Sequence, residues 1–478
     1  MKATKIFMMA ALALMTIACS NDDFTEQPIE QPVDNNNKEI TITATLAPKG
    51  NDGMRAVVDN GDDKITVTWA VDEHLAILYT KDGNQMADAR ITAVDDVTGA
   101  ATITFTVEGG TPDNTDCQIV YPLSAAKSDK SGVKAYADML ATQDGVLDGD
   151  LDVRVGAGKI QVTTPGLDVT TQPAAQYSIF KFTIQNLSST DKTATQFKVS
   201  DNSGNVITTV TPSSATGTLY VALPVLATGM YWFNATIDSK AYIAKATVST
   251  ATLAGKYYQS TVKMATVGDA ILSDGKFATK GTSGQQAAIV YVGTVDKYFN
   301  HFLAIALADA AYGVTWSAAL TAIGTYAGNH PITIGGTTYN NTNACISGYY
   351  DVVSDNNATT SATATTLHQG WRMPTVTDWR YLYAGIFGKS PTDPIGVNHG
   401  LEYSNSSSSG DDKTKIRQVV SNKILKSYAV PGATIYNTWF SSEVTGNDGK
   451  AWDFEPDYCS FYYVEKTNTL NVVAVFAY

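Results

Sequence analysis

Apolar and polar residues alternate through much of the first half of the chain, which is the pattern of half-buried β-strands. Residues 40–46 read Ile-Thr-Ile-Thr-Ala-Thr-Leu, and residues 101–107 repeat the alternation. Successive side chains of a strand point to opposite faces, so one face can pack on a core while the other meets water. Gly, Asp and Asn separate these runs, as expected of turns. The pattern predicts antiparallel sheets.

Further apolar runs predict the remaining strands of two β units. They lie at residues 64–69, 75–79 and 117–121 in the first unit, and at 177–184, 217–223, 230–237 and 258–264 in the second. Long helical periodicity is absent from this half. We therefore expect a mainly β protein that begins with two tandem antiparallel β-sandwiches, over residues 38–158 and 159–265, with a charged, Gly-rich connection at 145–158.

The period changes near residue 375, where a helix is predicted. Thr375 and Asp378 have the spacing of a capping box, in which two side chains each bond the other residue's backbone N–H. Pro374 stands just before this cap and fixes how the chain enters the helix. Apolar residues then recur at helical spacing from Trp379 to Ile386. The sequence predicts a short amphipathic helix that docks on a larger body.

Short apolar runs predict the strands around this helix. They lie at residues 287–292, 302–307, 438–442, 451–454, 460–464 and 470–478. A second helix is expected over residues 340–349, carrying Cys345. Residues 266–478 are thus expected to form a third, α+β domain, in which 470–478 is an internal strand.

Composition and charge narrow the possible functions. Of 478 residues, 44% are hydrophobic and 17% charged, and the formal net charge is −13. Phosphate binding needs clustered Lys and Arg, so this balance argues against a nucleic acid partner. The five His residues include none in a catalytic setting, and no Ser/His/Asp arrangement can be assembled. We therefore expect no enzymatic activity and no cofactor, and His368 is interpreted as a packed or exposed residue.

The N-terminus has the pattern of an export signal. Residues 1–5 are basic, and 6–17 are apolar but too short to span a bilayer as a helix. The small residue Ala18 before Cys19 resembles a bacterial lipobox, which implies that residues 1–18 are removed and that Cys19 carries lipid; a plain secretory signal is the alternative. Residues 19–37 read as a flexible, lipid-anchored linker, and their acidic start resembles a surface-export signal. The expected location is the outer membrane and cell surface.

Three further cysteines, Cys117, Cys345 and Cys459, remain. Outside the cytoplasm a pair of them can form a disulfide. Cys345 and Cys459 fall in the same expected domain, so they are the favoured pair, and Cys117 is then a buried free thiol. No CxxC and no Cys/His spacing indicates zinc.

Several residues of the two β units resemble the fimbrillin family. Arg55, Val67-Thr-Trp69, Asp72 and the run 75–79 look like its first domain. Residues 217–224 and 253–258 look like the late strands and closing turn of its second domain. The resemblance covers roughly residues 38–265. It implies transthyretin-like sandwiches and a subunit or accessory protein of type V pili.

This resemblance also implies processing and partners. An Arg-specific protease cuts many fimbrillins near the first strand, which opens a groove for a donor strand from the next pilus subunit. The matching position here is Arg55–Ala56; an ordinary surface arginine is the alternative. Residues 470–478 read as an internal strand with none after it to donate, which suits a terminal subunit.

The third domain resembles the bacterial branch of the C-type-lectin-like fold that carries a Gly-Trp-Arg-Leu-Pro-Thr motif. Met373 replaces the Leu, and Val473-Ala474 stands where Arg-Pro is common. The motif residues are Gly370, Trp371, Arg372, Pro374, Thr375, Trp379 and Trp439. They are expected to be structural, with ligand contact as the alternative. Recognition is expected in the loops 355–366 and 404–412.

The resemblance raises two further possibilities for the third domain. Asp453, Glu455 and Asp457 echo calcium-lectin motifs and offer oxygen ligands, but their order differs, so chance in an acidic loop is the simpler explanation and no metal is expected. Formylglycine-generating enzymes share the fold but need paired reactive cysteines, and Cys345 and Cys459 lie near no recognisable site.

Together these patterns predict a surface lipoprotein that acts as a fimbrial tip or accessory adhesin. Its partners would be other pilus subunits, bound by strand addition, and an unknown host or bacterial surface ligand, with a glycan as one candidate. The alternative is a stand-alone glycan-binding surface lipoprotein that is never assembled into pili.

Overall fold

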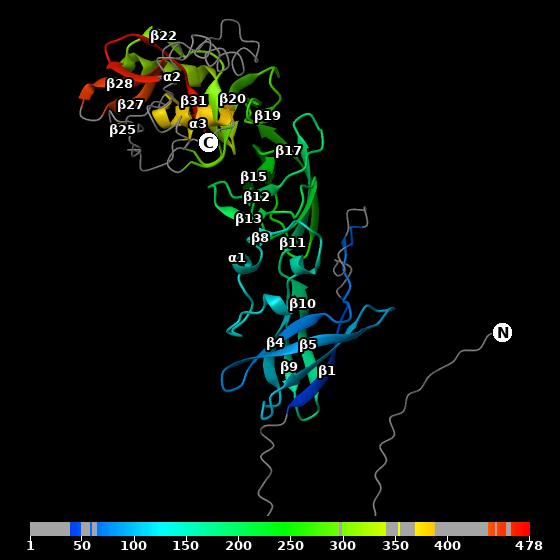
Figure 1. Ribbon diagram of the computed structural model, residues 1–478. Helices are drawn as coiled ribbons and strands as arrows, with labels where there is room; N and C mark the ends of the chain where they lie inside the picture. The colour runs from blue at the N-terminus through cyan, green and yellow to red at the C-terminus, as the bar shows by residue number, and fades with distance from the viewer. Residues whose placement is uncertain are drawn as a thin grey trace, which may run out of the picture.

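The computed structural model describes residues 39–48, 58–59, 65–295, 299–340, 352–353, 369–387, 438–444, 447–455 and 460–478. The fold is mainly β and contains several sheets. Figure 1 shows three units in a row: β1, β4, β5, β9 and β10 at one end, β8 with β11 to β17 in the middle, and α2, α3 and β31 at the other end.

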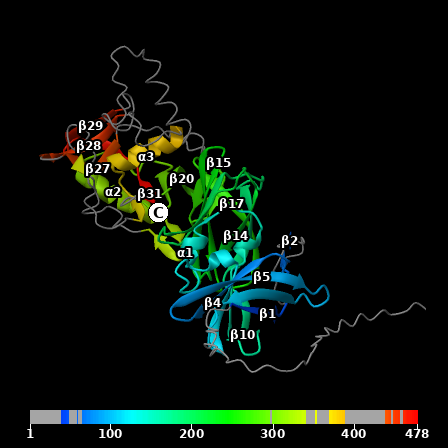
Figure 2. The same cartoon turned by 60° about the horizontal axis from the view of Figure 1, so that its bottom comes forward.

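The first unit is one seven-stranded antiparallel sheet that curls on itself. Its strands, in spatial order, are β1 (Ile40–Leu46), β6 (Ala101–Val107), β5 (Asn84–Val94), β4 (His74–Thr80), β7 (Thr115–Tyr121), β9 (Arg154–Gln161) and β10 (Gly166–Ala175). The curl brings β10 close to β1 and encloses a core that includes Ile77, Phe105 and Ile119. In Figure 2, β1, β4 and β5 lie on the side turned toward the viewer.

The first sheet ends later in the chain than expected. The expected boundary between residues 158 and 159 falls inside β9, which pairs with β7 on one side and β10 on the other. The expected strand at 64–69 is shorter than predicted: β3 (Ile65–Thr66) pairs with β2 (Val58–Asp59), although Val67 and Trp69 are buried as the alternation indicates. Residues 145–158 include the start of β9 and are not only a connection.

The second unit is an eight-stranded sheet folded into two layers. Its strands, in spatial order, are β14 (Thr218–Leu223), β11 (Ser178–Asn186), β17 (Tyr257–Thr266), β16 (Lys240–Val248), β15 (Gly229–Ile237), β12 (Gln196–Ser200), β13 (Val206–Val210) and β8 (Thr142–Gln143). β17 pairs with β16 at only two positions, Tyr242↔Thr266 and Ile243↔Ala265, and the sheet folds there. The core between the layers includes Phe182, Phe197 and Phe233.

The expectation of a wholly antiparallel second unit was wrong. β11 and β17 pair in parallel over eight positions, and β13 pairs in parallel with β8. Parallel neighbours need a long crossover, and the five strands β12 to β16 supply most of the chain between β11 and β17. Strand alternation alone carries no information about such long-range direction.

The segment between β7 and β9 ties the two β units together. It includes α1 (Tyr136–Met139) and β8, and it packs between the outer face of β4 and the strands β11 and β14. Gln143 is buried here: its Oε1 accepts from the Ala222 N–H at 2.9 Å, and its Nε2 lies 2.9 Å from both the Leu140 and the Ala222 carbonyl. Because a buried amide without partners is costly, these bonds favour one relative placement of the two units.

The third unit contains two larger sheets and two helices. The sheet nearest the second unit has the order β19 (Phe277–Ala278), β18 (Ala270–Leu272), β20 (Gln285–Val292), β21 (Phe302–Ala306), β31 (Val475–Ala477) and β26 (Gly370–Arg372). The other has the order β22 (Ala311–Val314), β30 (Leu470–Val472), β27 (Thr438–Val444), β28 (Asn447–Glu455) and β29 (Ser460–Glu465), and β25 (Val352–Val353) pairs with β27. A short hairpin joins β23 (Ile332–Ile334) and β24 (Thr337–Tyr339).

Both helices pack on the strands of this unit. α3 (Val376–Phe387) covers the predicted helical stretch and lies against β20. A Cβ added at Gly385 would lie 1.9 Å from the Val290 carbonyl oxygen, so only glycine permits this close approach. α2 (Trp316–Asn329) was not predicted, whereas the helix expected over residues 340–349 lies almost entirely outside the described residues. Within the described ranges, no helix is long and apolar enough to cross a membrane.

Candidate functional site

The edge strand β1 is the first candidate site. Ile42 and Leu46 are fully buried and Ala44 is 8% exposed, while the threonines between them face solvent. Seven residues of β1 pair with β6, from Ile40↔Val107 to Leu46↔Ala101. In the described part of the chain, the ladder of β1 has this one neighbour, because β10 approaches its other side without ladder pairing.

Two side chains hold the end of β1. The indole Nε1 of Trp69 donates to the Ala47 carbonyl at 3.2 Å, and the Ala47 N–H donates to Oε1 of Gln172 on β10, also at 3.2 Å. Trp69 itself is 3% exposed and meets Tyr121 edge to face, with the ring centroids 5.4 Å apart. Trp69 of the fimbrillin-like pattern thus helps to hold the end of β1 in place.

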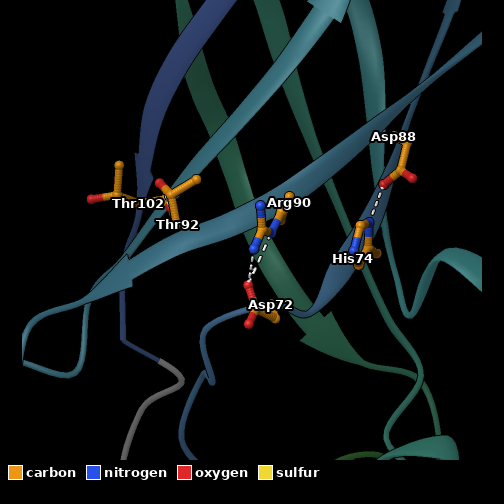
Figure 3. A network of polar contacts seen from close by, with 6 residues as sticks. All are labelled: Asp72, His74, Asp88, Arg90, Thr92 and Thr102. Carbon is orange, nitrogen blue, oxygen red and sulfur yellow. Dashed lines mark hydrogen bonds and ion pairs between the residues drawn. The ribbon is translucent and has the colours of Figure 1, made fainter.

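Asp72 of the same pattern lies in an exposed network of charged residues (Figure 3). It has a left-handed φ of 72°, and its N–H donates to the Ile91 carbonyl at 2.9 Å. Nε of Arg90 on β5 donates to Asp72 Oδ1 at 2.9 Å, and Nδ1 of His74 lies 2.6 Å from Asp88 Oδ1. The network connects the turn before β4 to β5. Exposed pairs of this kind contribute about 0–1 kcal/mol, so its role is to shape a turn.

The second candidate is the aromatic motif between β26 and α3. The Asp378 N–H donates to Thr375 Oγ1 and the Thr375 N–H donates to Asp378 Oδ2, both at 2.9 Å, which is a complete capping box. Asp378 also accepts from Arg372, through Nη2 at 2.5 Å and Nε at 3.2 Å. Both charged side chains are 0% exposed. Arg372 is therefore placed to stabilise the fold and is not available to a ligand in solution.

The tryptophans of the motif lie in the core. Trp371, Trp379 and Trp439 are each at most 1% exposed. The Nε1 of Trp371 donates to the His330 carbonyl at 2.7 Å, and the Nε1 of Trp439 donates to the Val314 carbonyl at 2.9 Å. These bonds connect β26 and β27 to the ends of α2 and β22, so the motif joins parts of the unit that are distant in sequence.

The last strand of the sequence is internal to its sheet. β31 pairs with β21 on one side and β26 on the other, and Figure 1 places the C-terminus within the third unit. Residues 472–478 are all at most 2% exposed. Removing β31 would therefore expose the core of the whole unit.

An aromatic cluster joins the second and third units. Trp232 of β15 is fully buried, and its ring lies 4.1 Å from that of His301, nearly parallel to it. Asn202 Oδ1 accepts hydrogen bonds at 3.2 Å from both Trp232 Nε1 and Tyr478 Oη. Burial lowers the pKa of His301 to about 4, so this ring is neutral at physiological pH. This contact could not be predicted from the sequence, because its members come from four separate segments.

Several predicted site residues cannot be placed by this structure. Cys19, Arg55, Ala56, Cys345, Cys459 and Asp457 lie outside the described residues, as does His368. Asp453 and Glu455 lie on β28, and within the described ranges no three His, Cys, Asp or Glu residues form a group that could hold a metal ion. Pro374 lies between β26 and α3.

The prediction for Cys117 is confirmed. The thiol is free and buried, and burial raises its pKa to about 12. At such a pKa almost no thiolate forms near neutral pH, so Cys117 is an unreactive core residue.

Comparisons with known proteins found only distant likenesses. No protein-family model and no curated protein matches the chain. A fimbrial protein from Bacteroides ovatus is 12% identical, with 92% of this chain and 100% of that one covered and a TM-score of 0.25. A fimbrial assembly protein from Parabacteroides distasonis is 11% identical, over 47% of this chain and 92% of that one, with a TM-score of 0.27.

A tip fimbrial protein, Mfa3 from Porphyromonas gingivalis with a C-terminal truncation, is also similar. It is 10% identical, over 48% of this chain and 99% of that one, with a TM-score of 0.25. The chain is thus distantly similar in structure to fimbrial proteins. At these scores the similarity carries no argument about function, which must come from the chain's own geometry.

Proposed function

We propose that the protein is a cell-surface adhesin or accessory subunit of a fimbrium, and that it receives a strand from another subunit in the place of β1. One observation carries this proposal: β1 is an edge strand that inserts Ile42, Ala44 and Leu46 into a curled sheet and is held by a single ladder. Without β1, the seven residues of β6 would lose their backbone partners on that side. A strand from another chain with the same alternation would satisfy them.

The position of Arg55 supports this exchange. In the sequence it lies between the end of β1 at Leu46 and the start of β2 at Val58. A cut after Arg55 would separate β1, with any lipid on Cys19, from the other described strands. The remaining covalent chain would keep the rest of the first sheet and its core.

The third unit is proposed to be the lectin-like, ligand-presenting part. Its motif residues Trp371, Arg372 and Asp378 are buried and fully occupied with structure, which favours recognition by loops outside the motif. Its internal strand β31 is unsuited to donation, because leaving would expose a core. The protein would then accept a strand at β1 but would not donate β31, as a tip or accessory subunit does.

Mass spectrometry of the N-terminus tests the proposal on protein recovered from sheared fimbriae. A chain that starts at Ala56 and is absent from fimbriae-free membranes is the expected result. A lipid-bearing chain with an uncut Arg55, recovered only from membranes, would contradict it and would favour the stand-alone surface lipoprotein. An Arg55→Lys variant is the matched control, because it keeps the charge and removes the Arg-specific cleavage site.

A further inference from the structure

A cavity of about 400 Å³ opens where the third unit meets β16 and β17 of the second. Three lysines line it: Lys245 from β16, Lys263 from β17, and Lys276 just before β19. Phe277 forms an aromatic wall beside them, and Leu187 adds an apolar surface. No carboxylate is among its lining residues, although the chain as a whole carries a net charge of −13.

The positive charges of this cavity are only partly neutralised. Lys276 Nζ pairs with Asp274 Oδ2 at 2.6 Å at the rim. Lys245 and Lys263 form no ion pair with any residue in the described part of the chain. The Asp274 carboxylate also acts on Lys245 from the rim, so one carboxylate stands against the three ammonium groups of this cavity.

Lys245 is fixed in position by aromatic rings. Its Nζ lies 5.7 Å from the ring centroid of Trp232 and 5.8 Å from that of Phe277, distances typical of cation–π contacts. Burial lowers the pKa of this ammonium to about 8, while the nearby Asp274 carboxylate acts to raise it. Trp232 is fully buried at the junction of the second and third units, so this contact places Lys245 beside that junction.

The strand register brings a second charge toward Lys245. The ladder between β16 and β17 ends at Ile243↔Ala265, and two residues beyond that pair lie Lys245 on β16 and Lys263 on β17. Like charges directly opposite on neighbouring strands are destabilising. The end of this ladder therefore brings two ammonium groups to the same cavity.

We propose that this lysine cavity is a binding site for an oxyanion group, a sulfate or phosphate ester, whose carrier packs against Phe277 and Leu187. An oxyanion that contacts the ammonium groups of both Lys245 and Lys263 would neutralise the two charges together. An ammonium is a suitable point-charge partner for such a group. The apolar wall would contact the carbon skeleton that bears the ester. The site is independent of strand acceptance at β1, so either proposal can fail without the other.

Saturation-transfer difference NMR on the full chain tests the site with three probes: glucose 6-sulfate, glucose 6-phosphate and glucose. We expect transfer to one or both esters and none to glucose, with inorganic sulfate or phosphate as competitors. Transfer to only one ester would identify the chemistry of the carrier. Equal transfer to glucose, or no transfer to either ester, would overturn the proposal.

Charge-removing variants locate the binding. Lys263→Gln changes an exposed side chain and is expected to weaken ester binding at least tenfold without loss of folding, and Lys245→Gln is expected to do the same. Lys240→Gln is the matched control, because it removes the same charge from an exposed position on β16. Binding that survives Lys263→Gln, or that falls equally in Lys240→Gln, would contradict the assignment.

Lysine acylation followed by mass spectrometry gives a second readout on the unmodified protein. Saturating ester should slow the acylation of Lys245 and Lys263 several-fold and leave Lys240 unchanged. Equal rates with and without ester at all three lysines would contradict the proposal.

Discussion

The strands β1 and β31 stand in contrast, although each lies near one end of the described chain. β1 is paired on one side, and its threonines face solvent, whereas β31 is paired on both sides and is wholly buried. β1 buries only alternate residues, and its neighbours keep their other partners when it leaves. β31 lies between β21 and β26 and contacts the core of the whole unit through Phe476. β1 could therefore leave its sheet with less loss of pairing and burial than β31, which is what the proposed strand exchange requires.

The largest effect should come from the buried ion pair that supports β26 beside β31. Asp378→Asn would leave Arg372 charged, fully buried and without its counter-charge. Breaking a buried pair in this way typically costs about 3–5 kcal/mol. Thermal unfolding should show loss of the third unit, while hydrogen exchange at β1 stays unchanged.

Asp238→Asn is the matched control for that variant, because Asp238 lies on an exposed turn with a φ of 49°, a conformation that Asn tolerates. Equal destabilisation by the two substitutions would show that the Arg372–Asp378 pair has no special role.

Leu46→Ala should destabilise the packing of β1 on the first sheet and leave the third unit intact. Leu46 is fully buried opposite Ala101, and truncation of a buried Leu costs about 2–5 kcal/mol. Hydrogen exchange should accelerate in β1 and β6 and stay slow in β31. Thr45→Ala, next to it but facing solvent, is the control, and acceleration as large as that of Leu46→Ala would contradict a core role for the strand.

The contact between the second and third units should weaken in acid through His301. Its pKa is lowered to about 4 in the folded protein, mainly by burial, against an unfolded value of 6.5. Only the unfolded state therefore takes up this proton between those values, so the stabilisation is full above about pH 6.5 and falls as the pH approaches 4. The loss reaches at most about 3 kcal/mol.

Denaturant unfolding from pH 7 to 4 checks this slope. His301→Gln should flatten it. An unchanged slope in His301→Gln would assign the acid sensitivity to other groups. Asp309 is not one of them, because burial raises its pKa to about 7 and its contribution to stability therefore grows as the pH falls.

The smallest effect is expected at the exposed network of Figure 3. The side chains of Arg90 and Asp72 are 58% and 66% exposed, and such pairs contribute about 0–1 kcal/mol. Arg90→Ala should therefore shift the denaturation midpoint only slightly. A loss as large as that of Leu46→Ala would show that the turn before β4 helps to hold β1.

Local patterns predicted much of the fold. The alternation at residues 40–46 and 101–107 matches β1 and β6 residue for residue, and the Thr375/Asp378 spacing produced the capping box. These features depend on residues that are close in sequence. A short window of the chain is therefore enough to predict each of them.

Other elements were missed for identifiable reasons. β5 turns small alanines, Ala87 and Ala89, inward between charged residues, so its hydrophobic contrast is weak. β9 contains Gly156, where an added Cβ would lie 2.6 Å from the Thr171 carbonyl oxygen of β10; the glycine reads as a loop signal but permits close packing. In α2, Ala319, Ile323 and Ala327 are buried at helical spacing, but interspersed Thr and Gly, which are weak helix formers, obscure it.

The candidate sites were predictable only where they are local. Trp69 and Asp72 could be selected from the sequence, but the Trp69–Ala47 bond could not, because it joins separate segments. The lysine cavity and the His301–Trp232 stack depend on how β15, β16 and β17 meet the third unit. That arrangement follows from tertiary packing, which no single window of the chain encodes.

Strand exchange after cleavage tests the central claim most directly. The protein is cut after Arg55, and a labelled peptide with the sequence of residues 38–48 is added while hydrogen exchange is followed in β6 and β31. The account predicts that the peptide replaces the cleaved segment and protects β6, that a peptide with Ile42→Asp and Leu46→Asp does not, and that β31 stays protected throughout. Failure of the native-sequence peptide to bind, or equal binding of the Asp-substituted peptide, would contradict an exchangeable strand at β1.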